Sequence, residues 1–438
     1  MNGLLLIVLA LLIWGPPRLR VDPRPLEVSL TDPLNIDFVA LLQVVVWLLG
    51  GVIVLFCLLS RGTRRPPLPR AMRSGPLTVY LIYCCYALLS VGYSLNPPYT
   101  LFFAAKLLIA LFACSLLLNA YEPLESMRKL LGVFYAVNVV QWLAIVVCYY
   151  TNPALVGKQI PGVGYRLNAV LFGDFGVSAV VSGLFFLSRV TQPLGLLQRL
   201  FFALLYVSSL YFVYLSRTRS SIACAVVFFF LFVGLDRRRW IKAAMFLGCV
   251  AVAVFALAGE FEDDVFAYLM RGQRMQAILS LTGRTTAFGY LASIWEESPI
   301  WGHGYAAGSR GFLLSFVYEY RLGIGAAHDA LSKVLVDLGI AGLSLLGLTI
   351  AYGFIELARA WKRCKGSAPS RELCQHAIAL FAASLLSSAV SGGVADLCFP
   401  LTIALGCFTL LRSVGVSTVR VEAPLVCGTM RPHVVRSW

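Results

Sequence analysis

The feature that most limits the fold of this chain is a series of long apolar stretches, each close to the length of a membrane-spanning helix. A helix needs about 20 predominantly apolar residues to cross the hydrocarbon core of a bilayer. Strands of membrane barrels alternate between apolar and polar residues over about 10 positions, and these stretches are too long and too continuously apolar for that pattern. We therefore predict an all-α integral membrane protein with about 12 transmembrane helices. The predicted spans lie near residues 3–15, 37–59, 76–95, 100–119, 131–150, 168–188, 196–215, 219–235, 240–258, 331–355, 376–392 and 395–412.

The composition agrees with a membrane protein. Of the 438 residues, 59% are hydrophobic and only 13% are charged, whereas about a quarter of the residues of a soluble protein are charged. This excludes a soluble enzyme, a nucleic-acid-binding domain and a disordered chain. The first stretch is short, but it lacks the basic start and the small-residue cleavage site of a signal peptide, so we interpret it as a span.

Lysine and arginine are distributed unevenly between alternate loops. One set of short loops holds 18 of them and the opposite set holds 7. The positive-inside rule places the basic set in the cytoplasm, together with both termini. Most of the net charge of +15 is therefore explained by the orientation of the chain in the membrane, and it does not indicate binding of nucleic acid. The basic loops are residues 60–75, 119–130, 189–199, 236–242 and 356–375.

One loop is much longer than the others and divides the chain. The predicted organisation is transmembrane helices 1–9 over residues 1–258, a large outer loop over 259–330, transmembrane helices 10–12 over 331–412, and a basic cytoplasmic tail over 413–438. Long loops in compact proteins are usually functional or disordered, and the many aromatic residues in this one argue against disorder. We predict a folded cap with helices near 265–281 and 284–297 and a glycine-rich turn near 302–311.

The tight turn between the seventh and eighth spans places two arginines beside serine and threonine hydroxyls at the outer membrane surface. Arg217 and Arg219 lie within Ser216-Arg217-Thr218-Arg219-Ser220-Ser221. Guanidinium groups bind phosphate in a bidentate manner, and neighbouring hydroxyls add hydrogen bonds. We interpret the turn as an oxyanion site, while snorkelling arginines at the end of a span are the structural alternative.

Two further outer segments carry basic residues. Gly283 precedes Arg284 at a predicted helix start, where free N–H groups can bind an anion, although an ordinary helix start with a solvated arginine fits equally well. The outer loop at 151–167 holds Lys158 and Arg166 among proline and glycine.

A histidine stands at the start of the tenth span. His328 is followed by Asp329, and histidine can act as a general base or bind a sugar hydroxyl near neutral pH. A histidine at the membrane interface without catalytic function is the alternative. His303, which is flanked by glycines, is interpreted as part of a turn. Gly339 and Gly342 are predicted to permit close helix packing.

The chain lacks motifs for metals and nucleotides. It has no C-x-x-C pair, no H-E-x-x-H motif, no Walker A pattern and no carboxylate cluster for a divalent metal, so we predict no metal and no cofactor. Chemistry at the outer face without a nucleotide requires an activated substrate. In a bilayer, a polyprenyl-diphosphate-linked glycan fits this requirement, with arginine replacing a metal at the leaving group.

Taken in order, these residues resemble the O-antigen ligase and polymerase superfamily of bacterial envelope glycosyltransferases. The resemblance rests on Thr218-Arg219-Ser220-Ser221, on Gly283-Arg284 leading into Trp295-(x3)-Pro299-(x2)-Gly302-(x)-Gly304, and on His328-Asp329 followed after nine residues by Gly339-Ile340-Ala341-Gly342. It implies a GT-C-like bundle of about a dozen helices in the bacterial inner membrane, with a large periplasmic loop before the last three.

The resemblance also implies an activity. It indicates metal-independent, inverting transfer of a glycan from an undecaprenyl-diphosphate donor to an acceptor hydroxyl at the periplasmic face. We favour a ligase with lipid A–core as the acceptor. The alternatives are a polymerase that extends a lipid-linked O-antigen or exopolysaccharide repeat, and, from a different class, a secondary transporter or flippase. Transporters often show two related halves, and this sequence shows no such repeat.

Residue roles follow from the same resemblance. Arg219 and Arg284 would bind the diphosphate, with Arg217 as a neighbour or substitute for Arg219. Arg166 is a further candidate for a donor contact, and His328 would activate the acceptor hydroxyl. The family usually has Asn, Ser or Gln after this histidine, so Asp329 is a departure. Its carboxylate would raise the basicity of His328 or bind a sugar hydroxyl.

Overall fold

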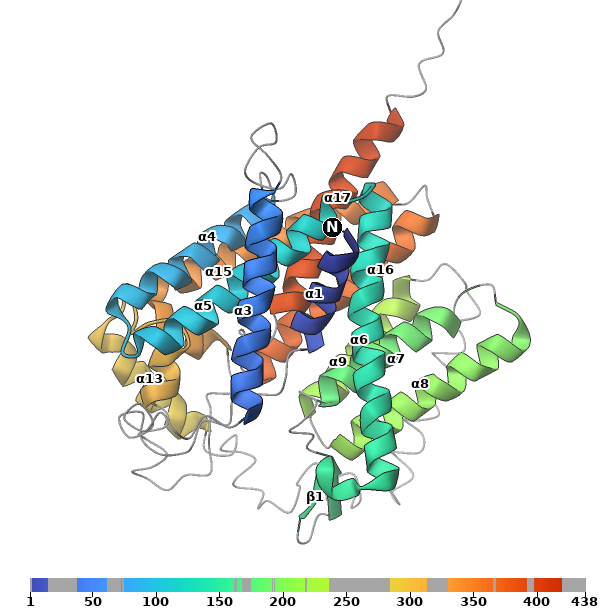
Figure 1. The fold of residues 1–438 in the computed structure, drawn as a ribbon, viewed down its shortest axis with the longest axis horizontal. Coiled ribbons are helices and arrows are strands. Elements are labelled where there is room, and N and C mark those ends of the chain that lie inside the picture. The colour runs from blue at the N-terminus through green and yellow to red at the C-terminus, as the bar shows by residue number, and fades with distance from the viewer. Residues whose placement is uncertain are drawn as a thin grey trace, which may run out of the picture.

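The structure is a computed structural model in which most of the chain is helical (Figure 1). It describes residues 2–14, 38–60, 72, 75–160, 164–167, 175–190, 192, 194–216, 219–235, 284–312, 330–364, 368–391 and 398–419. Each predicted span overlaps a described helix, except 240–258, which lies outside these residues. The helices with these spans are α1 (Asn2–Trp14), α3 (Phe38–Leu59), α4 (Pro76–Leu89), α5 (Pro97–Leu118), α6 (Pro123–Thr151), α7 (Phe175–Val190), α8 (Leu196–Ser216), α9 (Arg219–Leu235), α15 (Ala330–Arg363), α16 (Ala368–Ser391) and α17 (Cys398–Val419).

The remaining described elements lie in the connections. Helix α13 (Arg284–Glu297) matches the bounds predicted for the second helix of the cap, whereas the helix predicted at 265–281 lies outside the described residues. Short 3-10 helices occupy Ser90–Tyr93 (η3) and Pro153–Leu155 (η4). The connection at 151–167 contains a small antiparallel hairpin of β1 (Gly157–Ile160) and β2 (Gly164–Leu167), which the apolar pattern of the sequence did not predict.

Local sequence signals explain where several helices begin. Proline lies in the first turn of α4, α5 and α6, where its missing N–H costs no helical hydrogen bond. The side chain of Asn96 caps α5, because its Oδ1 accepts a hydrogen bond from the backbone N–H of Tyr99 at 3.2 Å.

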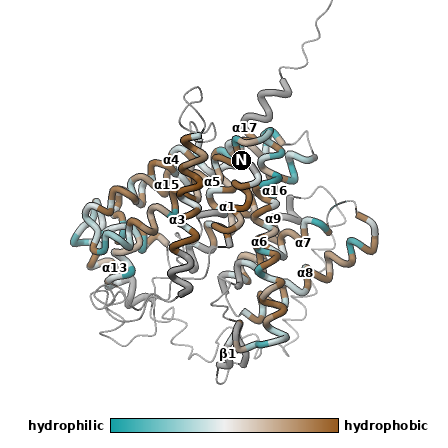
Figure 2. Tube along the Cα trace, viewed as in Figure 1, coloured by the Kyte–Doolittle hydropathy of each residue, from teal (hydrophilic) through white to brown (hydrophobic). Residues whose placement is uncertain are grey.

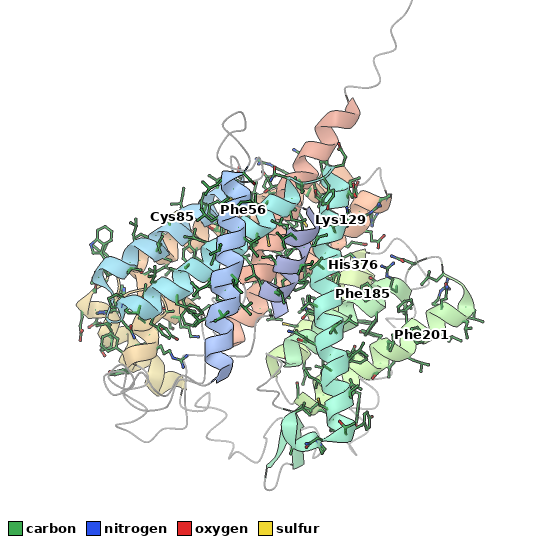
Figure 3. All side chains as sticks on the ribbon, viewed as in Figure 1. Phe56, Cys85, Lys129, Phe185, Phe201 and His376 are labelled. Atoms are coloured by element: carbon green, nitrogen blue, oxygen red, sulfur yellow. The ribbon has the colours of Figure 1, made fainter. Side chains whose placement is uncertain are left out.

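The helices have the apolar surface of a membrane protein. Within the described residues, five helical segments are long and apolar enough to cross a bilayer: Pro76–Tyr93, α5, α6, α8 and α15. Figure 2 shows apolar residues along most of the helical length. Phe56 of α3 and Phe201 of α8 are exposed (Figure 3). The prediction of an α-helical, multi-pass membrane protein is therefore confirmed, and the number of twelve spans stays a prediction.

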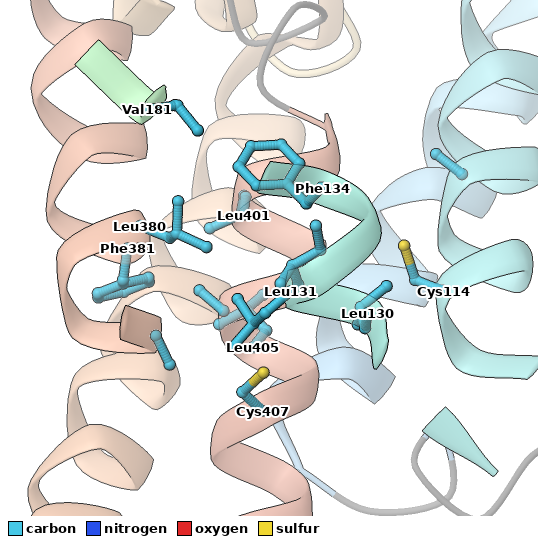
Figure 4. Packing of buried hydrophobic residues seen from close by; sticks show 14 of the residues in the cluster. Cys114, Leu130, Leu131, Phe134, Val181, Leu380, Phe381, Leu401, Leu405 and Cys407 are labelled. Carbon is cyan, nitrogen blue, oxygen red and sulfur yellow. The ribbon is translucent and has the colours of Figure 1, made fainter. Parts of the chain in front are cut away.

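The core lies where α6 meets the two C-terminal helices. Leu130, Leu131 and Phe134 of α6 pack with residues of α16 and α17, as Figure 4 shows. Phe381 and Phe408 are fully buried there, with ring centroids 5.6 Å apart. Helix α15 contacts α4, α16 and α17 beside this core, so it connects the centre of the bundle to the cap helix α13.

Candidate functional site

Two of the predicted diphosphate ligands are the first residues of helices. Arg219 begins α9 and Arg284 begins α13. Neither helix has an acidic residue in its first turn. A helix start exposes free N–H groups and the positive end of the dipole, so a cation is electrostatically unfavourable there unless an anion is also bound. The two helices pack against different neighbours, α9 against α7 and α16, and α13 against α15.

The third predicted ligand with a described backbone lies in the hairpin. Arg166 of β2 is directly opposite Lys158 of β1 in the strand register. Strand β2 contacts α8, the helix that ends at Ser216. The loop that the sequence marked only by its basic residues therefore contains a hairpin whose register pairs these two positions.

The other predicted site residues lie outside the described residues. These are Arg217, His328 and Asp329. Helix α15 begins at Ala330, directly after the histidine and aspartate, so the predicted position of this pair before a long helix is confirmed.

Helix α15 is interrupted at Gly339, nine residues after the start of the helix. Gly339 has φ 63° and ψ −165°, which no helical residue adopts. In an unbroken helix, the N–H groups of Ile340 and Ala341 would donate to the carbonyls of Val336 and Asp337. Here they donate instead to the carbonyls of residues 299 and 300, at 2.9 and 3.3 Å.

The two carbonyl groups freed by the break also find partners in the same short segment. The N–H of His303 donates to the carbonyl of Val336 at 3.0 Å, and the N–H of Gly304 donates to that of Asp337 at 2.8 Å. Residues 299–304, which we call the docking segment, therefore replace two helical hydrogen bonds by four bonds of their own. The Tyr86 hydroxyl of α4 donates to the next carbonyl, Leu338, at 3.3 Å.

Glycines permit this close approach of two backbones. A Cβ on Gly302 would lie 2.5 Å from the carbonyl carbon of Asp337, and one on Gly339 would collide with the carbonyl of Ile300. Gly302, Gly304 and Gly339 all have positive φ, which residues with a side chain rarely adopt. We predicted helix packing from Gly339 and Gly342; the structure shows instead that Gly339 admits the docking segment.

Asp337 also binds the residues that follow the docking segment and holds them beside the break in α15. Its Oδ2 accepts a hydrogen bond from the N–H of Ala306 at 3.0 Å, and its Oδ1 accepts one from the N–H of Ser309 at 2.6 Å. The side chain is buried, with 4% of the residue exposed. Among the described residues, Ala306 is the one non-glycine residue with positive φ, at 61°. Such strain persists only where surrounding contacts hold it.

The docking segment is also bound to the α4–α5 connection. The Tyr93 hydroxyl donates to the Trp301 carbonyl at 2.9 Å, and the Leu95 N–H donates to the His303 carbonyl at 3.1 Å. His303 Nε2 lies 3.0 Å from the Ile294 carbonyl oxygen, and its ring packs on Phe312. The interpretation of His303 as part of a turn is therefore confirmed.

Our sequence analysis did not identify two residues of this region as candidate site residues. Asp337 lies in an apolar span, and this is a signal in itself, since ionisable residues at membrane depth are costly and usually functional. Arg310 was not identified at all. Its guanidinium lies 5.8 Å from the ring centroid of Tyr99, and its buried Nε has no hydrogen-bond partner among the described residues.

A small pocket lies within the described helical bundle. A pocket between α7, α8 and α9 has a volume of about 10 Å³ and a mostly apolar lining that includes Gly183, Tyr206 and Phe228. This is room for one water molecule at most. Across the ranges that the structure describes, no group of three or more His, Cys, Asp or Glu side chains could hold a metal ion.

These features define the class of the protein as a multi-pass α-helical membrane protein in which residues 299–304 bind into a broken helix. The O-antigen ligase family model matches residues 202–347, from α8 to the middle of α15. The resemblance to the O-antigen ligase superfamily is thus confirmed over this segment, and it supports an enzymatic function of the ligase and polymerase family. No curated protein matches the chain. The matched segment contains Arg217, Arg219, Arg284, His328 and Asp329, whereas Arg166 precedes it.

Proposed function

We propose that this protein is a glycosyltransferase that transfers a glycan from an undecaprenyl-diphosphate donor to an acceptor hydroxyl. It acts at the periplasmic face of the bacterial inner membrane as an O-antigen ligase, with lipid A–core as the acceptor. The observation that carries the proposal is the pair of arginines that begin α9 and α13 inside the matched family segment. Arginines at two helix starts whose first turns hold no acidic residue suit a doubly charged diphosphate better than they suit the helices alone.

In the proposed reaction, Arg219 and Arg284 bind the diphosphate and stabilise its charge as it leaves. Arg217 assists beside Arg219. Arg166 contacts the donor from the hairpin. The arginines make this step independent of a metal ion.

His328 takes the proton of the acceptor hydroxyl, and Asp329 supports the histidine or binds a sugar hydroxyl. The acceptor oxygen attacks the anomeric carbon from the face opposite the diphosphate. The bond between this carbon and the diphosphate oxygen breaks, and undecaprenyl diphosphate leaves with the bonding electrons. Because a single displacement occurs, the anomeric configuration is inverted.

The test uses purified protein, an undecaprenyl-diphosphate-linked oligosaccharide and EDTA, with and without lipid A–core, and a glycan gel as the readout. We expect a product only in the lane that contains lipid A–core. A ladder without added acceptor would replace the ligase by the polymerase. An absence of product in both lanes, with an authentic donor, would favour a transporter or flippase, and rescue by magnesium after chelation would contradict the arginine mechanism.

Two variants assign the roles within this assay. Arg219→Ala should abolish transfer because the leaving group loses a cation, while the protein stays folded in the membrane. His328→Ala should lower turnover far more than donor binding. Full activity of Arg219→Ala would remove the diphosphate assignment, and a defect of His328→Ala confined to binding would remove the base assignment.

A transporter would use charged residues within its spans, and the sequence has three charged residues within or at the edge of predicted spans, Lys106, Asp174 and Asp396. Lys106 of α5 lies with its Nζ 5.0 Å from the ring centroid of Trp47 in α3. A cation–π contact of this kind is a structural role for the charge and requires no transport path. The others, Asp174 and Asp396, lie outside the described residues.

A further inference from the structure

The break in α15 is stable only while the docking segment occupies it. Two helical hydrogen bonds are opened at Gly339, and all four of their backbone groups are bound again by residues 299–304. An unpaired backbone group in apolar surroundings costs several kcal/mol, so the break and the docking segment form one unit. The first turns of α15, which follow His328 directly, are held by this unit.

Asp337 is the one acidic side chain among the described contacts of this unit. Both of its carboxylate oxygens are used, Oδ1 by the Ser309 N–H and Oδ2 by the Ala306 N–H. An amide of the same shape would lose one of these bonds and would direct an NH₂ group at a backbone N–H. The carboxylate is therefore matched to two donors in a way that asparagine cannot reproduce.

We infer that Asp337 is a positioning residue, which fixes the start of α15, and with it His328, relative to the cap. The inference rests on the proposed function. Asp337 lies seven residues after Ala330, which corresponds to about 10 Å of helix. Two turns of α15 thus separate Asp337 from Ala330, and His328 precedes Ala330 by two residues in the sequence. A misplacement of about 1 Å can lower a reaction rate about 100-fold.

The test compares Asp337→Asn with Glu356→Gln in the purified full-length protein. Glu356 is a matched control, because it is also a buried carboxylate of α15, with 1% of the residue exposed, and pairs with Arg359 through its Oε1 at 2.6 Å. It lies 19 residues further along the helix, or about 28 Å away. We expect Asp337→Asn to lower kcat about 10- to 100-fold with little change in the KM of the donor, and Glu356→Gln to leave both unchanged.

Hydrogen–deuterium exchange provides a readout that does not depend on activity. Peptides covering residues 303–312 should exchange faster in Asp337→Asn than in the wild type or Glu356→Gln, because two amide protons lose their shared acceptor. Asp337→Glu retains the charge and should give intermediate turnover; it serves as the measured variant if Asp337→Asn does not fold.

Three results would overturn the inference. They are wild-type kcat in Asp337→Asn or Asp337→Glu, an equal loss in Glu356→Gln, and a change confined to KM. Failure of the proposed function is recognised separately, since the wild-type protein would then form no product although the exchange difference would persist.

Discussion

At the scale of single residues, the most constrained position described is Gly339. Its positive φ and the carbonyl of Ile300 both exclude a side chain. Gly347 lies eight residues further along α15, and a Cβ there would meet nothing within 4 Å. Substitution of each glycine in turn therefore separates the effect on stability of disturbing the break from the general effect of replacing a glycine in a helix.

We predict that Gly339→Ala lowers the free energy of unfolding by at least about 2 kcal/mol, from left-handed strain and the collision with the docking segment. Gly347→Ala should leave the stability unchanged or raise it by about 0.5–1 kcal/mol. Thermal unfolding of the purified proteins in the same detergent measures both. A Gly339→Ala variant as stable as the wild type would show that α15 can close into a regular helix.

Sequence reasoning at this scale worked where the chemistry is local. Arg284 before a helical pattern predicted a helix start that the structure confirms. The contacts of Asp337 could not be predicted, because its partners Ala306 and Ser309 are 31 and 28 residues away and donate through the backbone. Every residue except proline has a backbone N–H group, so the sequence does not indicate which of these groups will bind a side chain.

At the scale of elements, buried polar contacts join helices that are distant in the sequence. The Tyr135 hydroxyl of α6 lies 2.7 Å from His376 Nδ1 of α16, and both residues are buried. The Tyr135 ring also packs on Phe185 of α7, with centroids 5.5 Å apart. His376 and Phe185 are labelled near the centre of the bundle in Figure 3. One tyrosine therefore connects three helices.

We predict that Tyr135→Phe destabilises the protein by about 1–3 kcal/mol, because the ring contacts remain while a buried hydrogen bond is lost. Tyr150→Phe on the same helix is the control, since Tyr150 is 72% exposed. The midpoints of thermal unfolding of the two variants give the comparison. Equal midpoints would mean that the Tyr135–His376 bond contributes no net stability.

Element boundaries were predictable where hydropathy decides them. The apolar stretches predicted the positions of the helices, because membrane length and composition act on each helix separately. Their ends differ from the prediction by up to eight residues, as at the starts of α6 and α16. The hairpin at Gly157–Leu167 and the break in α15 were not predicted. Both depend on hydrogen bonds between segments, and neither changes the local apolar pattern.

At the scale of the whole molecule, contacts between loops agree with the topology predicted from charge. Gln192 donates to the Glu372 side chain at 2.6 Å, and this bond joins the connection before α8 to the first turns of α16, both of which we place in the cytoplasm. Leu95 donates to the carbonyl of His303, and this bond joins two segments that we place outside. Each bond connects segments that the charge pattern assigns to the same side, and the sidedness itself stays a prediction.

We predict the sidedness of the cap from this arrangement. A phosphatase that is active only outside the cytoplasm should be active when inserted after residue 297, at the end of α13, and inactive when inserted after residue 364, at the end of α15. The reverse pattern would place the arginines and His328 on the cytoplasmic side. It would thereby contradict the periplasmic reaction, whatever the activity of the protein.

The shared hydrogen bonds of the docking segment and α15 also determine how this protein can be recombined with its relatives. Residues 299–304 and 336–341 complete each other's backbones, although about 30 residues separate them. A chimera that exchanges the cap and keeps the original α15 would combine a docking segment and a broken helix from two different parents. A chimera that takes both from one parent would preserve the joint, so the smallest exchangeable module extends from α13 beyond Ala341.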